Sequence, residues 1–142
     1  APYGTPKYTS LILDNLIDVK DDGSFRLDMK YFDYCGGLTM TSPLFNDLFE
    51  HPNRTPEQEL TQFHMDVASS LQVVTEEIML KLTRSLSKQT KVRNLCLAGG
   101  VALNCIANEK IIKKTKYKKL FIFPACSDAG VPFGASDVRR PK

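Results

Sequence analysis

The segment that most restricts the fold is Asn94–Asn104, with the sequence NLCLAGGVALN. Its apolar first half is typical of a short strand, and Gly99-Gly100 predicts a tight turn into a helix that continues towards Thr115. Glycines at such a junction let the backbone approach a ligand closely, and the N–H groups of a helix N-terminus favour an anion such as phosphate. We place Asn104 on the first turn of that helix, within reach of the same ligand. A plain structural turn fits the spacing equally well, since neither GxGxxG nor GxxxxGK[ST] is present.

A second segment nearly repeats this pattern further along the chain. Leu120–Pro124 is a strand candidate, and Ser127–Gly130 is a turn of small residues before a helix start. Two consecutive strand–turn–helix units place both turns at the same edge of a parallel sheet, and we expect the site there. Asp128 in the second turn is a candidate ligand of a metal ion or its water. The alternative is that its carboxylate caps the next helix.

The rest of the chain predicts a mixed α/β fold with a partly parallel sheet, in a single domain that spans residues 1–142. Apolar spacing predicts a short helix over 11–17, a turn at 20–24, a half-exposed strand at 24–32 and a helical turn near 44–49. Thr55, Pro56 and Gln58 form a helix-start pattern, which predicts one long helix over 55–88 that covers one face of the sheet. Residues 93–135 then hold the two strand–turn–helix units.

The composition excludes several classes of protein. With 42% hydrophobic and 25% charged residues, the chain is typical of a globular domain. It has no apolar run of about 18 residues for a membrane span and no signal-peptide pattern, so we expect a cytoplasmic protein without a membrane partner. The net charge of +3 does not indicate DNA binding, and we expect the lysines of 110–119 to be a solvated face, with an anionic partner as the alternative. Because residue 1 is not Met, we expect a chain that is processed or cut from a longer protein.

Cysteine and histidine spacing predicts no zinc site. We expect the four cysteines to be reduced, with Cys96 and Cys105 buried as small apolar side chains. We expect His51 and His64 to lie at the surface or to be hydrogen-bonded, because no His–x3–His pair is present. We expect the acidic pair Glu76-Glu77 to be solvated.

Leu97–Asn104 together with Pro124–Gly130 resembles the NodU/CmcH-type carbamoyltransferases. The resemblance extends upstream to Ala1–Gly4, Asp22–Phe25 and Ala68–Gln72, so it covers most of the chain. It implies the latter lobe of an actin/hexokinase/Hsp70-like (ASKHA) ATPase fold, from a parent chain that also has an N-terminal lobe and a following YrdC-like domain.

The resemblance also implies an activity. Members of the family use carbamoyl phosphate and ATP to make carbamoyladenylate, and pass the carbamoyl group to a hydroxyl of a small-molecule acceptor such as a sugar or an antibiotic-like compound. The residues that the motifs assign to the adenylate pocket are Gly99, Gly100, Val101, Asn104 and Gly130. Asp128 matches a ligand of the divalent metal, Fe or Mn. No residue of this chain is assigned as catalytic.

The chain departs from the family pattern in three respects. It lacks the histidine pair that the family's metal site takes from an earlier segment, it lacks the YrdC-like domain, and Ser136–Lys142 does not continue the apolar helix expected after Gly134. We therefore expect the isolated chain to be inactive. Two alternatives stay open: transfer of threonylcarbamoyl to tRNA, and a non-catalytic module that keeps the fold for partner binding. Ala102-Leu103-Asn104 resembles the O-carbamoylating branch more than the tRNA-modifying branch.

Overall fold

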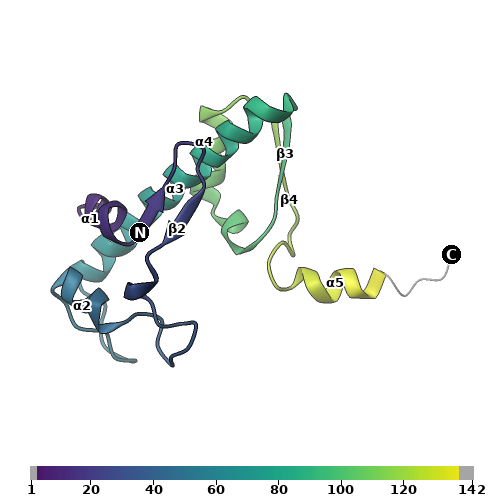
Figure 1. Cartoon of the computed structure of the whole chain (residues 1–142). Coiled ribbons are helices and arrows are strands. Elements are labelled where there is room, and N and C mark those ends of the chain that lie inside the picture. Colours follow the sequence, from purple (N-terminus) through teal and green to yellow (C-terminus); the bar gives the residue numbers. More distant parts are fainter. Residues whose placement is uncertain (1–2, 138–142) are drawn as a thin grey trace. The chain divides into compact units, whose positions relative to one another are not determined.

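The computed structural model describes residues 3–137 and divides the chain into two compact units, Ala1–Ile78 and Met79–Lys142 (Figure 1). The first two residues of the upstream resemblance and the tail from 138 onward lie outside the described residues. In chain order, the elements are α1 (Thr9–Asn15), β1 (Ile17–Val19), β2 (Phe25–Leu27), η1 (Met29–Tyr31), α2 (Pro43–Phe49), α3 (Gln62–Thr90), β3 (Asn94–Leu97), η2 (Gly100–Leu103), α4 (Cys105–Lys114), β4 (Lys119–Ile122) and α5 (Gly130–Asp137). Within this part of the chain, none of the helices has the length and apolar character needed to span a membrane.

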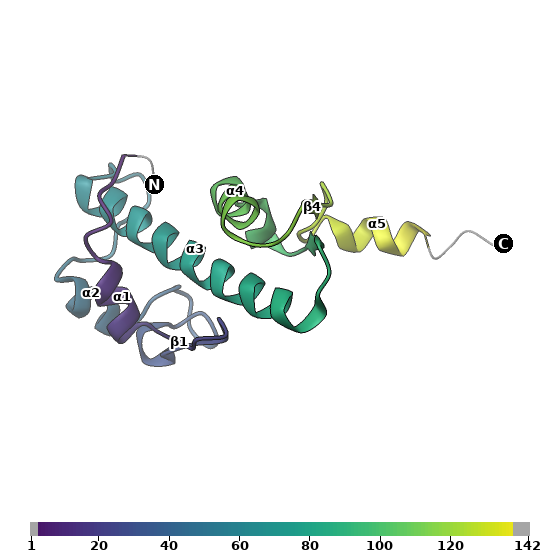
Figure 2. The ribbon, with the colours of Figure 1, turned by 90° about the horizontal axis from the view of Figure 1, so that it is seen from above.

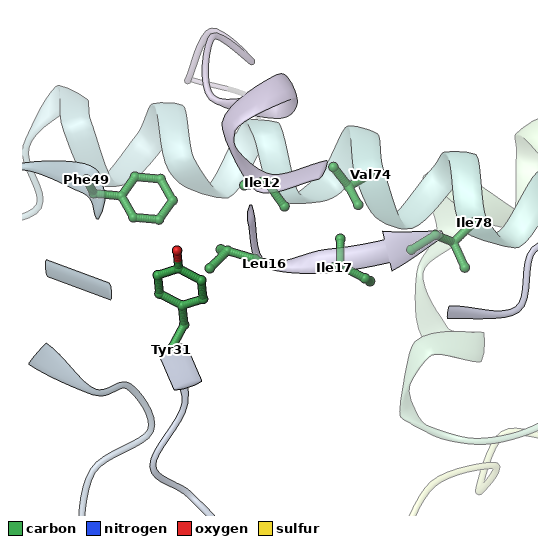
Figure 3. Packing of buried hydrophobic residues seen from close by; sticks show 7 residues of the cluster. All are labelled: Ile12, Leu16, Ile17, Tyr31, Phe49, Val74 and Ile78. Atoms are coloured by element: carbon green, nitrogen blue, oxygen red, sulfur yellow. The ribbon is translucent and has the colours of Figure 1, made fainter. Parts of the chain in front are cut away.

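The core of the first unit forms where α1, β1 and α2 pack on the N-terminal part of α3. Val74 and Ile78 lie one helical turn apart, so both face the same side of α3, and Figure 3 shows the other core side chains alongside them. Figure 2 shows α1 and α2 along one side of that helix. The buried core residues are Ile12, Leu16, Ile17, Tyr31, Phe49, Val74 and Ile78. The predicted short helix is confirmed as α1, although it ends at Asn15, and the predicted strand as β2, although it ends at Leu27. Strand β1, which pairs with β2 in an antiparallel hairpin, was not predicted.

The N-terminal segment is fastened to α3 by Asp66, whose side chain is only 2% exposed. Its carboxylate accepts a hydrogen bond from the Thr5 N–H at 2.8 Å and forms an ion pair with Lys7 Nζ at 2.7 Å. Gln62 Nε2 donates a third hydrogen bond at 2.8 Å. Gly4 lies so close to the helix that a Cβ there would collide with the carbonyl of Met65. The segment before α1 is therefore part of the packed unit.

The long predicted helix exists as α3, but its predicted start at Thr55 is wrong. The Gln58 side chain does accept a hydrogen bond from the Thr55 N–H at 3.2 Å, as the helix-start pattern requires. However, Glu57 has φ +67° and the Gln58 N–H bonds to the Thr55 carbonyl, so the pattern closes a turn. A left-handed residue after Pro56 is typical of a type II turn and interrupts a helix. Helix α3 therefore begins at Gln62 and ends at Thr90.

The second unit is built around the parallel pair β3–β4, with α4 as the crossover between them. Parallel strands need such a crossover, because the end of one strand and the start of the next lie at opposite edges of the sheet. The core residues are Leu95, Ile111 and Tyr117, with Met79, Leu80, Leu97 and Leu120 packed against them. The predicted single mixed sheet is wrong: among the described residues, β1–β2 and β3–β4 form separate two-stranded sheets. The sequence pattern identifies β2, β3 and β4 and the parallel order of β3 and β4, but it missed β1 and its pairing with β2.

Candidate functional site

The two predicted turns meet at one edge of the β3–β4 sheet. In the parallel register Leu97 pairs with Ile122, so both strands end at the same level. The Gly99 N–H donates a 2.6 Å hydrogen bond to the carbonyl of Cys126 in the second turn. The Cys126 thiol makes a weaker 3.6 Å contact to the Gly99 carbonyl. The prediction that both turns share one edge is confirmed.

Gly99 and Gly100 differ in backbone conformation, although neither has another atom of residues 3–137 within 4 Å of where a Cβ would lie. Gly99 has φ +92° and ψ 164°, a backbone conformation that is essentially restricted to glycine. Gly100 has no positive φ, and a Cβ built on it would meet no atom within 4 Å among the described residues. Gly99 is therefore required by the shape of the turn. Gly100 leaves open space beside the backbone, where a ligand can approach.

The segment after the glycines differs from the prediction of an immediate helix. A short three-ten turn, η2, follows Gly99, and α4 begins only at Cys105. Asn104 is the N-cap of α4, and its side-chain oxygen accepts a hydrogen bond from the Ala107 N–H at 3.1 Å. The placement of Asn104 on the first helical turn is therefore wrong by one position, because Asn caps a helix better than it continues one. Its side-chain oxygen holds the helix start.

Asn108 belongs to this site although the sequence reasoning missed it. Its Nδ2 donates a 2.7 Å hydrogen bond to the carbonyl of Ala102, in the middle of η2. The side chain is 8% exposed, and its Oδ1 has no hydrogen-bond partner among the described residues. The sequence did contain a signal for it. Asn108 is a polar residue three positions before the apolar Ile111, so it lies on the helix face that packs on the sheet.

In the second turn, Asp128 is exposed to solvent, whereas Gly130 packs against the backbone. Asp128 is exposed, and its backbone carbonyl accepts a 3.2 Å hydrogen bond from the Val131 N–H at the start of α5. A Cβ on Gly130 would lie 2.5 Å from the carbonyl of Ala125, so this glycine permits a close approach within its own turn. Across residues 3–137, no group of three or more His, Cys, Asp or Glu side chains could hold a metal ion. Asp128 is therefore at most one ligand of a larger set.

The two histidines lie in the first unit, within an aromatic cluster. The His51 ring stacks on Phe63 with centroids 3.9 Å apart, and it meets the His64 ring edge-on at 5.2 Å. The His64 Nδ1 accepts a hydrogen bond from the Thr61 N–H at 3.1 Å. Burial, followed by the nearby His51 and Arg54, lowers the pKa of His64. The His51 Nδ1 lies 2.9 Å from the Pro52 carbonyl, so the prediction of hydrogen-bonded histidines is confirmed for both rings.

Two predictions about exposure are wrong. Glu76 is buried, at 5% exposure, and accepts a 2.8 Å hydrogen bond from Gln72 Nε2, so it is not solvated as predicted. Cys96 and Cys105 are exposed free thiols, whereas we expected them to be buried. Cys96 alternates with the buried Leu95, and α4 covers only the face of the sheet to which Leu95 points. The alternation therefore puts Cys96 on the other face.

Comparison with known proteins identifies relatives of the whole described chain. The sequence model of a family described as "Carbamoyltransferase N-terminus" matches residues 1–136. The "Uncharacterized protein sll1178" of Synechocystis sp. is 55% identical over 136 residues, which are 96% of this chain and 22% of that protein. "Nodulation protein NolNO" of Sinorhizobium fredii is 32% identical over 96% of this chain and 18% of that protein. "Nodulation protein NolO" of Bradyrhizobium diazoefficiens is 32% identical over 99% of this chain and 25% of that protein. The chain thus spans roughly a fifth of the length of these curated relatives.

Proposed function

Because this chain belongs to the carbamoyltransferase family, we propose that it supplies the nucleotide-binding turns of an O-carbamoyltransferase. The proposed reaction consumes carbamoyl phosphate and ATP, proceeds through carbamoyladenylate, and transfers the carbamoyl group to a hydroxyl of a small-molecule acceptor. The described residues contribute binding and orientation to this reaction. The acceptor, a sugar or an antibiotic-like compound, is contacted by parts of the enzyme outside them.

The observation that carries this proposal is the hydrogen bond between the two turns, from the Gly99 N–H to the Cys126 carbonyl at 2.6 Å. It brings two glycine-containing turns to the carboxyl edge of parallel strands, the place where α/β proteins bind nucleotides. The open space beside Gly100 supports close approach of a phosphate or ribose to the backbone. Val101 is 56% exposed next to that space and offers apolar surface for a purine ring.

The residues of the proposed adenylate pocket act in two ways. We propose that Gly100 and Val101 face the ligand, because Gly100 has open space beside it and Val101 is exposed. Gly99, Asn104 and Gly130 shape the backbone, through the positive φ of Gly99, the α4 cap of Asn104 and the close packing of Gly130 on Ala125. Glycine and asparagine are therefore needed at these positions even where they do not touch the nucleotide.

For the metal, Fe or Mn, the described residues do not fit a complete site. A divalent transition metal needs several ligands that converge on one point, and the exposed Asp128 is a single carboxylate. We keep Asp128 as one proposed ligand, with the others supplied from outside residues 3–137.

The proposed enzyme is larger than this chain. We propose that the chain is the latter lobe of an ASKHA-type catalytic domain, and that the N-terminal lobe and a YrdC-like domain complete the enzyme in the cytoplasm. The mixed α/β structure supports this fold. The roughly fivefold greater length of the curated relatives supports a multi-part enzyme.

The test fills the open space beside Gly100 without disturbing the fold. We expect Gly100→Val in the full-length protein to weaken ATP binding at least tenfold, about 1.4 kcal/mol, in isothermal titration, while the melting temperature stays close to wild type. Gly36→Val is the matched control, because Gly36 also has open space around it and lies in the other unit. This control should bind ATP as the wild type does.

Two outcomes would contradict the proposal. If Gly100→Val binds ATP with wild-type affinity, the glycine turn is not the nucleotide site. If the wild-type protein binds neither ATP nor carbamoyl phosphate, the chain belongs to a non-catalytic module of the same fold.

A further inference from the structure

The nucleotide turn, which we define as Gly99–Asn104, is connected to α4 by a chain of hydrogen bonds. Asn108 Nδ2 donates to the Ala102 carbonyl at 2.7 Å, and the Ala102 N–H donates to the Gly99 carbonyl at 3.0 Å. The Gly99 N–H then donates to the Cys126 carbonyl at 2.6 Å. The series runs from a helix side chain, through both turns, in one donor direction. The covalent backbone of Ala102 and of Gly99 connects the successive bonds, so each bond restrains the position of the next.

The environment of Asn108 indicates why this position is polar. The side chain is 92% removed from solvent, and only half of its carboxamide is used, because Oδ1 has no partner among the described residues. A buried amide with an unpaired oxygen stabilises the fold less than an apolar side chain of similar size, because the oxygen loses its hydrogen bonds to water. The benefit of Asn108 therefore lies in the one bond that it makes, to Ala102. That bond reaches into the nucleotide turn.

Asn104 and Asn108 lie four residues apart, and each stabilises a different part of the nucleotide turn. Asn104 caps the start of α4 through the Ala107 N–H, and the Asn108 N–H bonds back to the Asn104 carbonyl. Asn108 then fixes the carbonyl of Ala102, which is 2% exposed and has no access to water as an alternative donor. Removal of the carboxamide would leave this carbonyl buried without its donor, and the turn would be free to change shape.

We propose that Asn108 is a positioning residue that holds the nucleotide turn in its binding conformation, and this rests on the nucleotide-binding function proposed above. Asn108 acts through the Ala102 peptide, and it does not touch the ligand. It differs from the motif residues because its contact is made by a side chain buried beneath the turn.

The test replaces Asn108 with a side chain of similar volume that cannot donate. In the full-length protein, Asn108→Leu should raise the Kd for ATP at least tenfold, while the Kd for carbamoyl phosphate changes much less. Hydrogen exchange of the unliganded protein should show the Gly99 and Ala102 amides exchanging at least tenfold faster. The control is Tyr117→Phe, which removes the other buried polar atom without a partner in the described residues. This control should leave both measurements at wild-type values.

A second variant keeps the proposal falsifiable if Asn108→Leu does not fold. In Asn108→Asp, only a protonated carboxyl can donate to the Ala102 carbonyl, so the loss of ATP affinity relative to wild type should be larger at pH 8 than at pH 5.5. The proposal is overturned if a folded Asn108 variant keeps wild-type ATP affinity and wild-type exchange rates. If the wild type binds no ATP but Asn108→Leu still speeds exchange in the turn, the proposed function fails and the holding role of Asn108 stands.

Discussion

Asp66 on α3 binds the N-terminal segment through Thr5 and Lys7. Its pKa is lowered from 3.8 to about 2, first by the hydrogen bond from Lys7 and then by those from the Thr5 N–H and Gln62. A carboxyl whose pKa is lower in the folded chain stabilises the fold while it is ionised. This contribution is fully present above about pH 4 and is lost as the pH falls towards the folded pKa of about 2.

We therefore expect Asp66→Asn to reduce stability at pH 7 and to lose its effect near pH 2. The measurement is the urea midpoint of the wild type and the variant between pH 2 and pH 7. Asp18→Asn is the control, since Asp18 also pairs with a lysine but has a 61% exposed side chain. Exposed pairs contribute little, so this variant should follow the wild type closely. A difference between wild type and Asp66→Asn that is the same at pH 2 and pH 7 would refute the proposed ionic origin.

At the scale of elements, α4 is held on the β3–β4 sheet mainly by Ile111, which has 0% exposure. We expect Ile111→Ala to lower the free energy of unfolding by about 2–5 kcal/mol, because it leaves a cavity between helix and sheet. Ile112→Ala is a matched control on the same helix, since Ile112 is 39% exposed. Urea unfolding monitored by circular dichroism would measure both. Equal losses for the two variants would mean that α4 is not anchored through Ile111.

The sequence predicted those elements whose signal is local. The β3 and β4 strands, their parallel order and the meeting of their turns follow from apolar runs that alternate with small-residue turns. The start of α3 was missed because Thr55 and Gln58 also form hydrogen bonds with each other when Pro56 lies in a single turn. Local pattern alone cannot separate a turn closed by Glu57 in the left-handed region from the first turn of a helix.

Features that depend on contacts between elements were not predictable in the same way. The role of Asn108 comes from a bond to a backbone carbonyl six residues earlier, across the junction of η2 and α4. The burial of Glu76 and the exposure of Cys96 depend on which face of an element is covered. The sequence gives the alternation along a strand, but not the identity of the covering element.

For the molecule as a whole, the proposal of a larger enzyme makes a direct prediction. The chain spans 22% of its relative from Synechocystis sp., and the proposed nucleotide site, which is open beside Gly100, needs further residues to enclose the ligand. We expect the 142-residue chain to bind ATP at least tenfold more weakly than the full-length protein, and to catalyse no carbamoyl transfer. Isothermal titration and a carbamoyl phosphate consumption assay on both proteins would measure this. Equal ATP affinity would show that the chain holds a complete nucleotide site.

The bond between the two turns has a consequence for how related sequences are able to diverge. It joins the backbone of Gly99 to the backbone of Cys126, so it depends on where each peptide group lies and only weakly on the side chain at position 126. We therefore expect substitution of Cys126 to be tolerated, and insertion or deletion of one residue between Leu97 and Gly99, or between Ile122 and Cys126, to move one partner of the bond out of register. Length variation in this family should accumulate in the loop 33–42 and be rare in these two short segments.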